Sequence, residues 1–169
     1  MPFSDGNAAY YGPSKEYSYI PLATNAVRMG TLAAMNLVEE KMAYPGTQAT
    51  SGIKIYEHNM AATGITEAEA KRRGIEVECV VVEDNCRPEF MPTYDKLTFK
   101  VVYEAKSKRI IGAQIHSSAD LTQSINTLSV CIQNKMLVTD LAFIDFFFQP
   151  HFNKPWNFVN MAGLESLNK

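Results

Sequence analysis

Three cysteines and three histidines are the side chains of this 169-residue sequence that could supply a nucleophile, a redox thiol or a metal ligand. Cys79 follows the apolar alternation of a predicted strand, and Cys131 lies in an apolar predicted helix, so we expect both to be unreactive thiols of the core. Cys86 lies in a more polar loop, with no activating group nearby in the sequence. Because Cys79 and Cys86 lack the spacing of metal ligands, we expect neither a metal site nor a catalytic cysteine.

The histidines lack the partners that catalysis requires. His58 and His116 lie on predicted strands without a paired carboxylate or cysteine, so we assign no role to either. His151 lies between Pro150 and Phe152, among several aromatic rings. Two interpretations of His151 stay open: it is a packing residue, or it donates a hydrogen bond or a proton at a cofactor.

Motifs that would complete an active site are missing from these residues. No G-x-G-x-x-G follows a strand, so the sequence contains no dinucleotide-binding fold. It also contains no P-loop, no C-x-x-C pair and no H-E-x-x-H helix. We therefore expect that this chain alone has no complete active site.

Aromatic side chains gather in residues 146–157, Phe-Phe-Phe-Gln-Pro-His-Phe-Asn-Lys-Pro-Trp-Asn. The segment holds five aromatic rings, two prolines and the only tryptophan. The prolines exclude a continuous helix, so the rings must be carried by a bent backbone. Either the segment plugs the domain's own core, or it forms a docking surface or one wall of a cofactor site.

Residues 1–45 differ in pattern from the residues that follow. Residues 1–18 show no periodicity, and apolar residues at helical spacing then predict a helix from about Leu22 to Lys41. The Tyr-Pro-Gly-Thr segment at 44–47 ends that helix and indicates a linker. One helix without a sheet to pack on suggests that 1–45 is the end of a domain whose body lies elsewhere. Residues 46–169 are expected to form a second domain.

The second domain is predicted to be α+β, with a mostly antiparallel sheet and helices packed on one face. Alternating residues predict strands near 53–58, 77–81, 97–103 and 111–115. Thr66 and Glu69 form a capping box for a short helix that Gly74 ends. A second helix is expected to be capped within 117–120 and to bury a face that runs from Leu121 to Ile132. Asp140 is expected to open a short helix that runs into the three phenylalanines.

Composition is that of a globular protein from a reducing compartment. A chain of this length buries about 70% of its unfolded surface, enough for one good core. A hydrophobic content of 46% and a net charge of −2 argue against disorder and against a nucleic-acid surface. An odd number of cysteines does not suit a disulfide framework, and no apolar run reaches membrane-spanning length. We expect a cytoplasmic protein without nucleic-acid or membrane partners.

Three segments together resemble one family, the FAD-dependent NADH oxidases and NADH peroxidases of the pyridine nucleotide-disulfide oxidoreductase superfamily. Residues 21–30, PLATNAVRMG, are similar to the helix that closes the flavin domain of these enzymes. Residues 50–65 are similar to the start of their dimerisation domain, and residues 146–157 to its end. The resemblance implies that this chain is the dimerisation domain, preceded by the tail of the flavin domain. The redox cysteine of the family lies in the N-terminal part that these residues do not include.

The resemblance also implies contacts with FAD. An aspartate of the family binds the ribityl chain of the flavin, and its counterpart here is Asp5, although Ser4 replaces the preceding glycine. Leu22, Ala23 and Thr24 correspond to the first turn of the helix aimed at the pyrimidine edge of the flavin. Free N–H groups and the positive end of a helix dipole stabilise negative charge there.

Two further contacts follow from the resemblance. Phe148 corresponds to the aromatic residue that approaches the flavin from the partner subunit. Gly52 corresponds to a contact with the nicotinamide nucleotide, where the lack of a side chain permits close approach. Gly52 is equally well interpreted as a turn residue at the start of a strand.

Three functional interpretations remain open. The chain belongs to an NADH oxidase or peroxidase, to a related coenzyme A disulfide reductase, or it is an autonomous dimeric assembly module without redox activity. The reductases are expected to carry tyrosines where this chain has Phe148 and Phe152. In each case we expect a homodimer. FAD and NADH are the cofactors of the parent oxidase, and the isolated chain is expected to bind neither and to be inactive.

Overall fold

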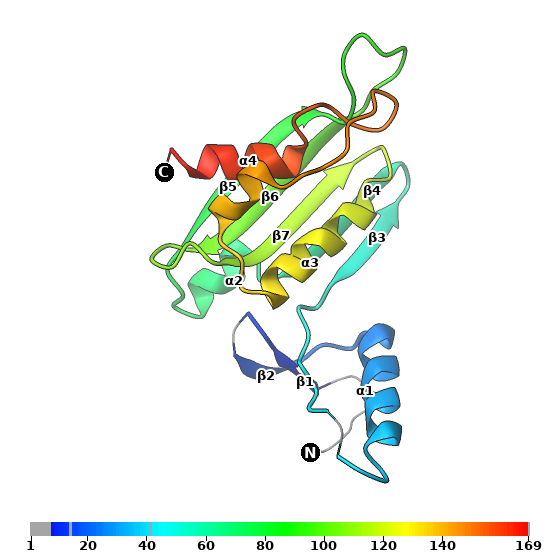
Figure 1. The fold of residues 1–169 in the computed structure, drawn as a ribbon, viewed down its shortest axis with the longest axis vertical. Helices are drawn as coiled ribbons and strands as arrows, with labels where there is room; N and C mark the ends of the chain where they lie inside the picture. The colour runs from blue at the N-terminus through cyan, green and yellow to red at the C-terminus, as the bar shows by residue number, and fades with distance from the viewer. Residues whose placement is uncertain (1–7, 14, 41, 169) are drawn as a thin grey trace.

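The computed structural model describes residues 8–13, 15–40 and 42–168. Its centre is a five-stranded antiparallel sheet with the strand order β3-β4-β7-β6-β5 (Figure 1). The strands are β3 (Ser51–Ile55), β4 (His58–Gly64), β5 (Val77–Asn85), β6 (Lys96–Glu104) and β7 (Ile110–Ser117). With the helices described below, this sheet confirms the predicted α+β fold.

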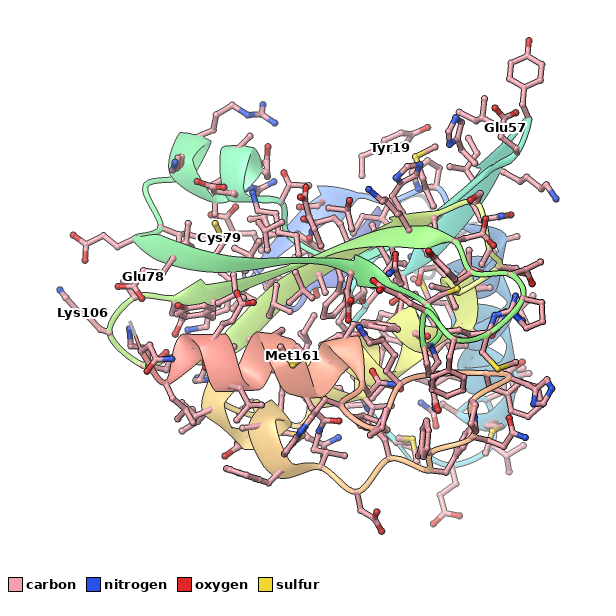
Figure 2. The ribbon with its side chains drawn as sticks, turned by 90° about the horizontal axis from the view of Figure 1, so that it is seen from above. Tyr19, Glu57, Glu78, Cys79, Lys106 and Met161 are labelled. Atoms are coloured by element: carbon pink, nitrogen blue, oxygen red, sulfur yellow. The ribbon has the colours of Figure 1, made fainter. Side chains whose placement is uncertain are left out.

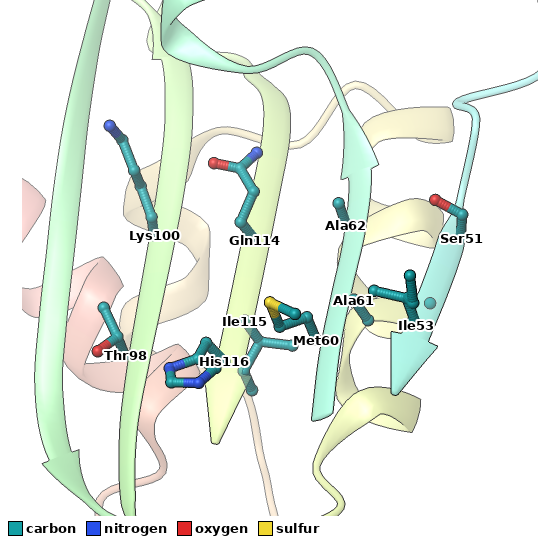
Figure 3. A pocket seen from close by; sticks show the side chains of 11 residues that line it. Ser51, Ile53, Met60, Ala61, Ala62, Thr98, Lys100, Gln114, Ile115 and His116 are labelled. Atoms are coloured by element: carbon teal, nitrogen blue, oxygen red, sulfur yellow. The ribbon is translucent and has the colours of Figure 1, made fainter. Parts of the chain in front are cut away.

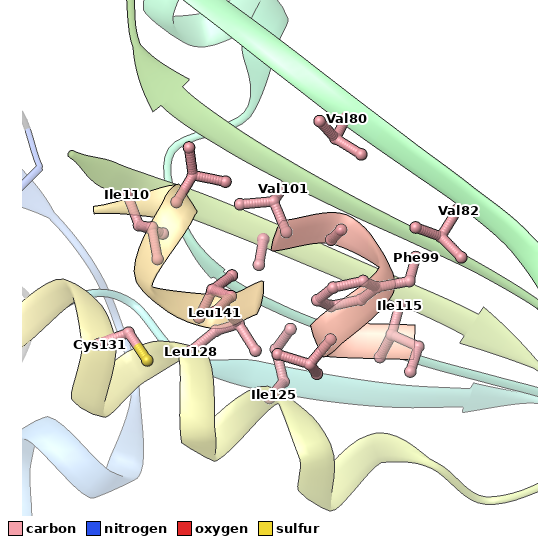
Figure 4. Close-up of a cluster of buried hydrophobic side chains, with 14 of the residues drawn as sticks. Val80, Val82, Phe99, Val101, Ile110, Ile115, Ile125, Leu128, Cys131 and Leu141 are labelled. Atoms are coloured by element: carbon pink, nitrogen blue, oxygen red, sulfur yellow. The ribbon is translucent and has the colours of Figure 1, made fainter. Parts of the chain in front are cut away.

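Side chains on one face of the sheet form the main core. Phe99 of β6 pairs with Val82 of β5 on one side and with Ile115 of β7 on the other. All three side chains are buried, so alternate residues of neighbouring strands form one continuous apolar row (Figure 4). The predicted alternation at 97–103 therefore marks the interior strand β6 correctly.

Helices cover this apolar face. They are α3 (Ile125–Gln133), α4 (Phe158–Ser166) and the 3₁₀ helices Thr122–Ser124 and Val138–Phe143. Leu128 and Leu141 bring α3 and the second 3₁₀ helix onto the sheet, and both are fully buried. The short α2 (Glu67–Arg72) lies on the opposite side of the sheet from α4 (Figure 2).

Gly163 sets how closely α4 approaches the second 3₁₀ helix. A Cβ atom at this position would lie 2.2 Å from the backbone nitrogen of Ala142. Real Cβ atoms do not come that close, so only glycine allows the two helices to pack at this distance. The loop that joins them is thereby held at one end.

Several predicted elements have different bounds in the structure. The strand expected over 53–58 ends at Ile55, and Tyr56 turns the chain with φ of 51° into β4. The second predicted helix begins only at Ile125, because residues 122–124 form a 3₁₀ turn first. Asp140 accepts a hydrogen bond from the Leu137 N–H at 2.8 Å and stabilises the predicted short helix, which ends before the three phenylalanines.

The cap of α2 agrees with the prediction. The Thr66 hydroxyl accepts a hydrogen bond from the Glu69 N–H at 3.2 Å. Gly74 follows the helix with φ of +69°, a conformation that glycine adopts without strain.

The N-terminal part contains more structure than the sequence predicts. β1 (Ala8–Tyr11) and β2 (Glu16–Tyr19) pair as an antiparallel hairpin, so the expectation of irregular structure over 1–18 is wrong for the described part of that range. Mainly polar and tyrosine residues carry these strands, which explains why no apolar period marks them. α1 (Ala23–Met35) follows and ends before the predicted Lys41.

The hairpin contacts the sheet domain. Tyr11 and Ile20 are buried in a second apolar cluster with Ile65, Val102 and Ile111. The Gly12 N–H donates to the Thr47 carbonyl at 3.0 Å, which holds the linker beside β1.

Candidate functional site

The three cysteines lie in different surroundings. Cys131 is buried in the main core, as expected. Cys86, expected in a polar loop, is also buried there, and its sulfur accepts a hydrogen bond from the Asp95 N–H at 3.2 Å. Cys79 is only half-buried on the other face of the sheet, and its Sγ donates to Glu67 Oε2 at 3.4 Å. Cys79 packs against the second apolar cluster and not in the main core, because Val80 and Val82 are the residues of β5 that face the main core.

The first turn of α1 lies at the surface. Leu22 is the N-cap residue and its side chain accepts no capping hydrogen bond. Ala23 and Thr24 are exposed. The first N–H groups of a helix have no partner within the helix, so this turn presents donors and a positive dipole end to the outside.

A buried asparagine that the sequence analysis did not single out anchors this turn. Asn25 is completely buried, and its Nδ2 donates to the Ile20 carbonyl at 3.3 Å. Its Oδ1 accepts from Arg28 at 2.7 Å and from the Tyr44 hydroxyl at 3.4 Å. These bonds fix the start of α1 to the strand before it and to the linker after it. The sequence did contain a signal for this role, since Asn25 is a polar residue among the apolar residues of the predicted helix.

The aromatic segment 146–157 faces outward. Only Phe146 packs against the main core. Phe147, Phe148, Phe152 and Trp156 are 69%, 45%, 65% and 50% exposed. The interpretation of the segment as a core plug is therefore wrong for most of its rings, and the docking interpretation agrees with their exposure.

Hydrogen bonds from side chains to the backbone hold this loop in shape. Asn153 Nδ2 donates to the Phe147 carbonyl at 2.8 Å, and Asn153 Oδ1 accepts from the Gln149 N–H at 3.0 Å. Asn160 Nδ2, buried in α4, donates to the Leu141 and Ile144 carbonyls at 3.0 Å. The exposed rings thus sit on an ordered backbone, as a preformed docking surface requires.

His151 is exposed within the same loop. Its Nδ1 lies 3.1 Å from Gln149 Nε2, and its backbone N–H donates to Gln149 Oε1 at 2.6 Å. It is therefore not a buried packing residue among the rings, and its imidazole has access to a neighbouring molecule.

The face of the sheet opposite the main core is hollowed. A depression of about 670 Å³ extends across β3, β4, β6 and β7 (Figure 3). Its lining is mostly apolar, with a few polar groups from Ser51, Thr98, Lys100, Gln114 and His116. Gly52 lies at its edge on β3 and is exposed.

The backbone conformation at position 52 does not require a glycine. It lies within β3, not in a turn, and it has no positive φ. A Cβ atom there would meet only Met60 O at 3.4 Å and the Ala61 Cβ at 3.8 Å. The interpretation as a turn residue is therefore wrong, and the backbone at this position has room for a small side chain in ordinary contact with β4.

Lys100, which lines the hollow, belongs to a small group of charged side chains with Glu67 and Lys71. Glu67 accepts hydrogen bonds from Lys100 and, at 2.6 Å, from Lys71. These two ammonium groups, Lys100 first, lower the pKa of the Glu67 carboxyl to about 2. The Lys100–Glu67 pair connects α2 to β6, and the Lys71–Glu67 pair lies within α2.

The candidate cofactor contacts fall on three separate elements. Leu22, Ala23 and Thr24 start α1, Gly52 lies on β3, and Phe148 lies in the loop before α4. Figure 1 shows α1 and the aromatic loop at opposite ends of the molecule. One chain therefore does not bring the start of α1 and Phe148 together. Asp5 lies outside the described residues.

Within the described residues, there is no group of three or more His, Cys, Asp or Glu side chains that could hold a metal ion. The same part of the chain contains no helix with the length and apolar character needed to cross a membrane.

Comparison with known proteins identifies the relatives of this chain. The family profile described as "Pyridine nucleotide-disulphide oxidoreductase, dimerisation domain" matches residues 50–157. An NADH oxidase of Enterococcus faecalis is 52% identical over 170 residues, which cover 98% of this chain and 38% of the relative. An NADH oxidase of Mycoplasma pneumoniae is 41% identical and is covered to 34%. The chain thus spans little more than a third of the length of these relatives.

A solved structure agrees over nearly the whole chain. The water-forming NADH oxidase of Lactobacillus brevis, bound to NADH, superposes with a TM-score of 0.93 at 44% identity. The match covers 96% of this chain and 37% of that protein. A coenzyme A polysulfide/persulfide reductase of Pyrococcus horikoshii is more distant, at 27% identity. The matched profile covers well over half of the sequence, and the chain belongs to the dimerisation-domain family of the pyridine nucleotide-disulphide oxidoreductases.

Proposed function

We propose that this chain is the subunit-pairing part of an FAD-dependent NADH oxidase, which passes electrons from NADH to oxygen. Residues 1–45 are then the tail of its flavin domain, and residues 46–169 are its dimerisation domain. The higher identity to NADH oxidases than to the coenzyme A reductase supports the oxidase. Phe148 and Phe152, where tyrosines are expected in the reductases, support the same choice.

One observation carries the proposal: the exposed first turn of α1 and the loop that carries the exposed ring of Phe148 lie beyond opposite ends of the sheet (Figure 1). A single flavin site can contain both the first turn of α1 and Phe148 only if they come from two chains. The chains must then pair so that the start of α1 in one faces the aromatic loop of the other. A closed two-fold dimer does this, because the same surface of each chain then contacts the other. The ordered loop with its exposed aromatic rings is the kind of surface that such pairing uses.

The chain's own residues fit two roles around a flavin. The N–H groups of Ala23 and Thr24 would hold negative charge on the ring system, next to Leu22, whose own N–H already donates to the Ile20 carbonyl at 2.9 Å. Asp5 would bind the ribityl chain. Phe148 of the partner subunit would form an apolar wall and exclude water. FAD, when bound, supplies the hydride-accepting chemistry.

Gly52 fits a contact with the nicotinamide nucleotide. Its exposed position at the edge of the hollow and its lack of a side chain would let a nucleotide-bearing segment approach the backbone. The parent protein would work in the cytoplasm, since the three cysteines of this chain form no disulfide, as is usual in a reducing compartment.

Reading the coding sequence upstream of Met1 tests the proposal. We expect an open reading frame with a G-x-G-x-x-G motif and a redox cysteine. The complete protein should then be yellow and should consume NADH with oxygen. In that protein, Phe148→Ala should lower the rate of NADH oxidation while the dimer persists. A reading frame without a dinucleotide motif, or a colourless complete protein, would contradict the proposal.

A further inference from the structure

Two histidines that are 58 residues apart in the sequence meet on the surface of the sheet. His116 Nε2 lies 3.0 Å from His58 Nδ1, and the ring centroids are 5.0 Å apart. His58 lies on β4 and His116 on the neighbouring β7, where it is directly opposite Met60. The pair is therefore diagonal across two hydrogen-bonded strands, and the backbone fixes the spacing of the rings.

The short distance constrains where the protons lie. Two imidazole nitrogens reach 3.0 Å only if at least one of them carries a lone pair toward the other. Glu57 helps to decide which one, because its Oε1 lies 3.7 Å from the other ring nitrogen of His58, Nε2. A carboxylate at that position favours the tautomer with the proton on Nε2, and Nδ1 of His58 then presents its lone pair to His116.

The same geometry suits a metal ion. We propose that His58 and His116 form a two-histidine site for a divalent transition-metal ion of the Ni²⁺ or Cu²⁺ type. Two nitrogens bound at right angles, each about 2.05 Å from the ion, are about 2.9 Å apart, close to the distance in this structure. A tetrahedral Zn²⁺ ion needs about 3.3 Å between its nitrogens, so Zn²⁺ binding requires the rings to separate.

Binding requires a change of tautomer and a rotation of the two rings. His116 moves its ring proton from Nε2 to Nδ1, and the rings turn so that both lone pairs point to the ion and no longer to each other. Glu57 plays the part of the carboxylate that orients a ligating histidine from behind. Both rings are exposed, so water can fill the remaining coordination positions. His116 also lines the hollow of the sheet, which places the ion at its rim (Figure 3).

Titration of the untagged 169-residue chain with NiCl₂ in a calorimeter tests the site. We expect saturable binding of one Ni²⁺ per chain. His58→Gln and His116→Gln should each weaken the affinity by about tenfold or more, because one nitrogen ligand is lost. Glu57→Gln should weaken it less, by up to about tenfold, since the carboxylate orients a ligand and does not bind the ion.

His151→Gln is the matched control, because it removes an exposed histidine in another part of the fold. It should leave the affinity for Ni²⁺ unchanged. Thermal melting of each variant establishes that it is folded. The proposal would be overturned if the wild-type chain showed no saturable binding of Ni²⁺, or if folded His116→Gln kept the wild-type affinity. It would also be overturned if His151→Gln lost as much affinity as the two variants of the site.

Discussion

Trp156→Ala should weaken the homodimer by about 2 to 3 kcal/mol for each subunit. Trp156 is 50% exposed in the single chain, and its ring lies 6.4 Å from that of Phe143 in an edge-on contact. If the exposed half of a side chain of about 250 Å² becomes buried on pairing, at about 25 cal/mol per Å², the gain is about 3 kcal/mol. A two-fold dimer contains two Trp156 rings, and this energy raises the dimer dissociation constant by about 30- to 150-fold for each ring that is lost.

Sedimentation equilibrium over a range of protein concentrations measures this constant. The wild-type chain should sediment with twice the monomer mass of 18.9 kDa, and the variant should dissociate at higher concentration. Tyr19→Ala is the control, because Tyr19 is 76% exposed on β2, at the end of the molecule away from the aromatic loop (Figure 1). It should weaken the dimer less than Trp156→Ala does, because Tyr19 lies outside the aromatic loop. A dimer unaffected by Trp156→Ala would remove this residue as an anchor, and a monomeric wild-type chain would refute the reasoning as a whole.

Four further outcomes are expected. The purified chain should show no flavin absorbance and consume no NADH, since it lacks a dinucleotide-binding fold; a yellow, active sample would contradict this. Amide exchange should be faster in Ala23–Met35 than in Ile125–Gln133, because α1 buries few side chains; equal protection of the two helices would show that another chain covers α1. The lowered pKa of Glu67 contributes stability that is fully present above the unfolded value of 4.5 and is lost as the pH falls through about 2, so Glu67→Gln should flatten the urea stability profile in this window. Gly163→Ala should cost about 3 kcal/mol in urea unfolding, because its Cβ overlaps Ala142; a neutral effect would contradict the packing described for α4.

The sequence predicts well those elements that have one buried and one exposed face. The alternation from Leu97 to Tyr103 marks the interior strand β6, and the cap at Thr66 marks the start of α2. In these segments the local pattern and the tertiary packing require the same residues.

The missed elements lack such a pattern. β4 (His58–Gly64) consists of small and polar residues, and its place in the sheet depends on pairing with β3 and β7. α4 is buried on most of its sides, so it shows no amphipathic period, and only Asn157, whose side chain accepts a hydrogen bond from Val159 N–H at 2.9 Å, signals its start.

The candidate site was predictable in its parts but not in its arrangement. The aromatic loop and the first turn of α1 are visible as sequence motifs. Their separation within one chain depends on the whole sheet lying between them, which no local pattern encodes. The pairing of His58 and His116 was missed for the same reason, since it depends on the register between β4 and β7.

The central claim is that Phe148 of one subunit lies near the start of α1 of its partner. Spin labels at positions 24 and 148, in a Cys79→Ser background, measure this by pulsed dipolar spectroscopy. Mixed chains that each carry one of the two labels report the distance between subunits, and doubly labelled chains diluted with unlabelled ones report the distance within a subunit. We predict that the distance between subunits is the shorter of the two. A shorter distance within the subunit, or no dipolar coupling between differently labelled chains, would contradict the account.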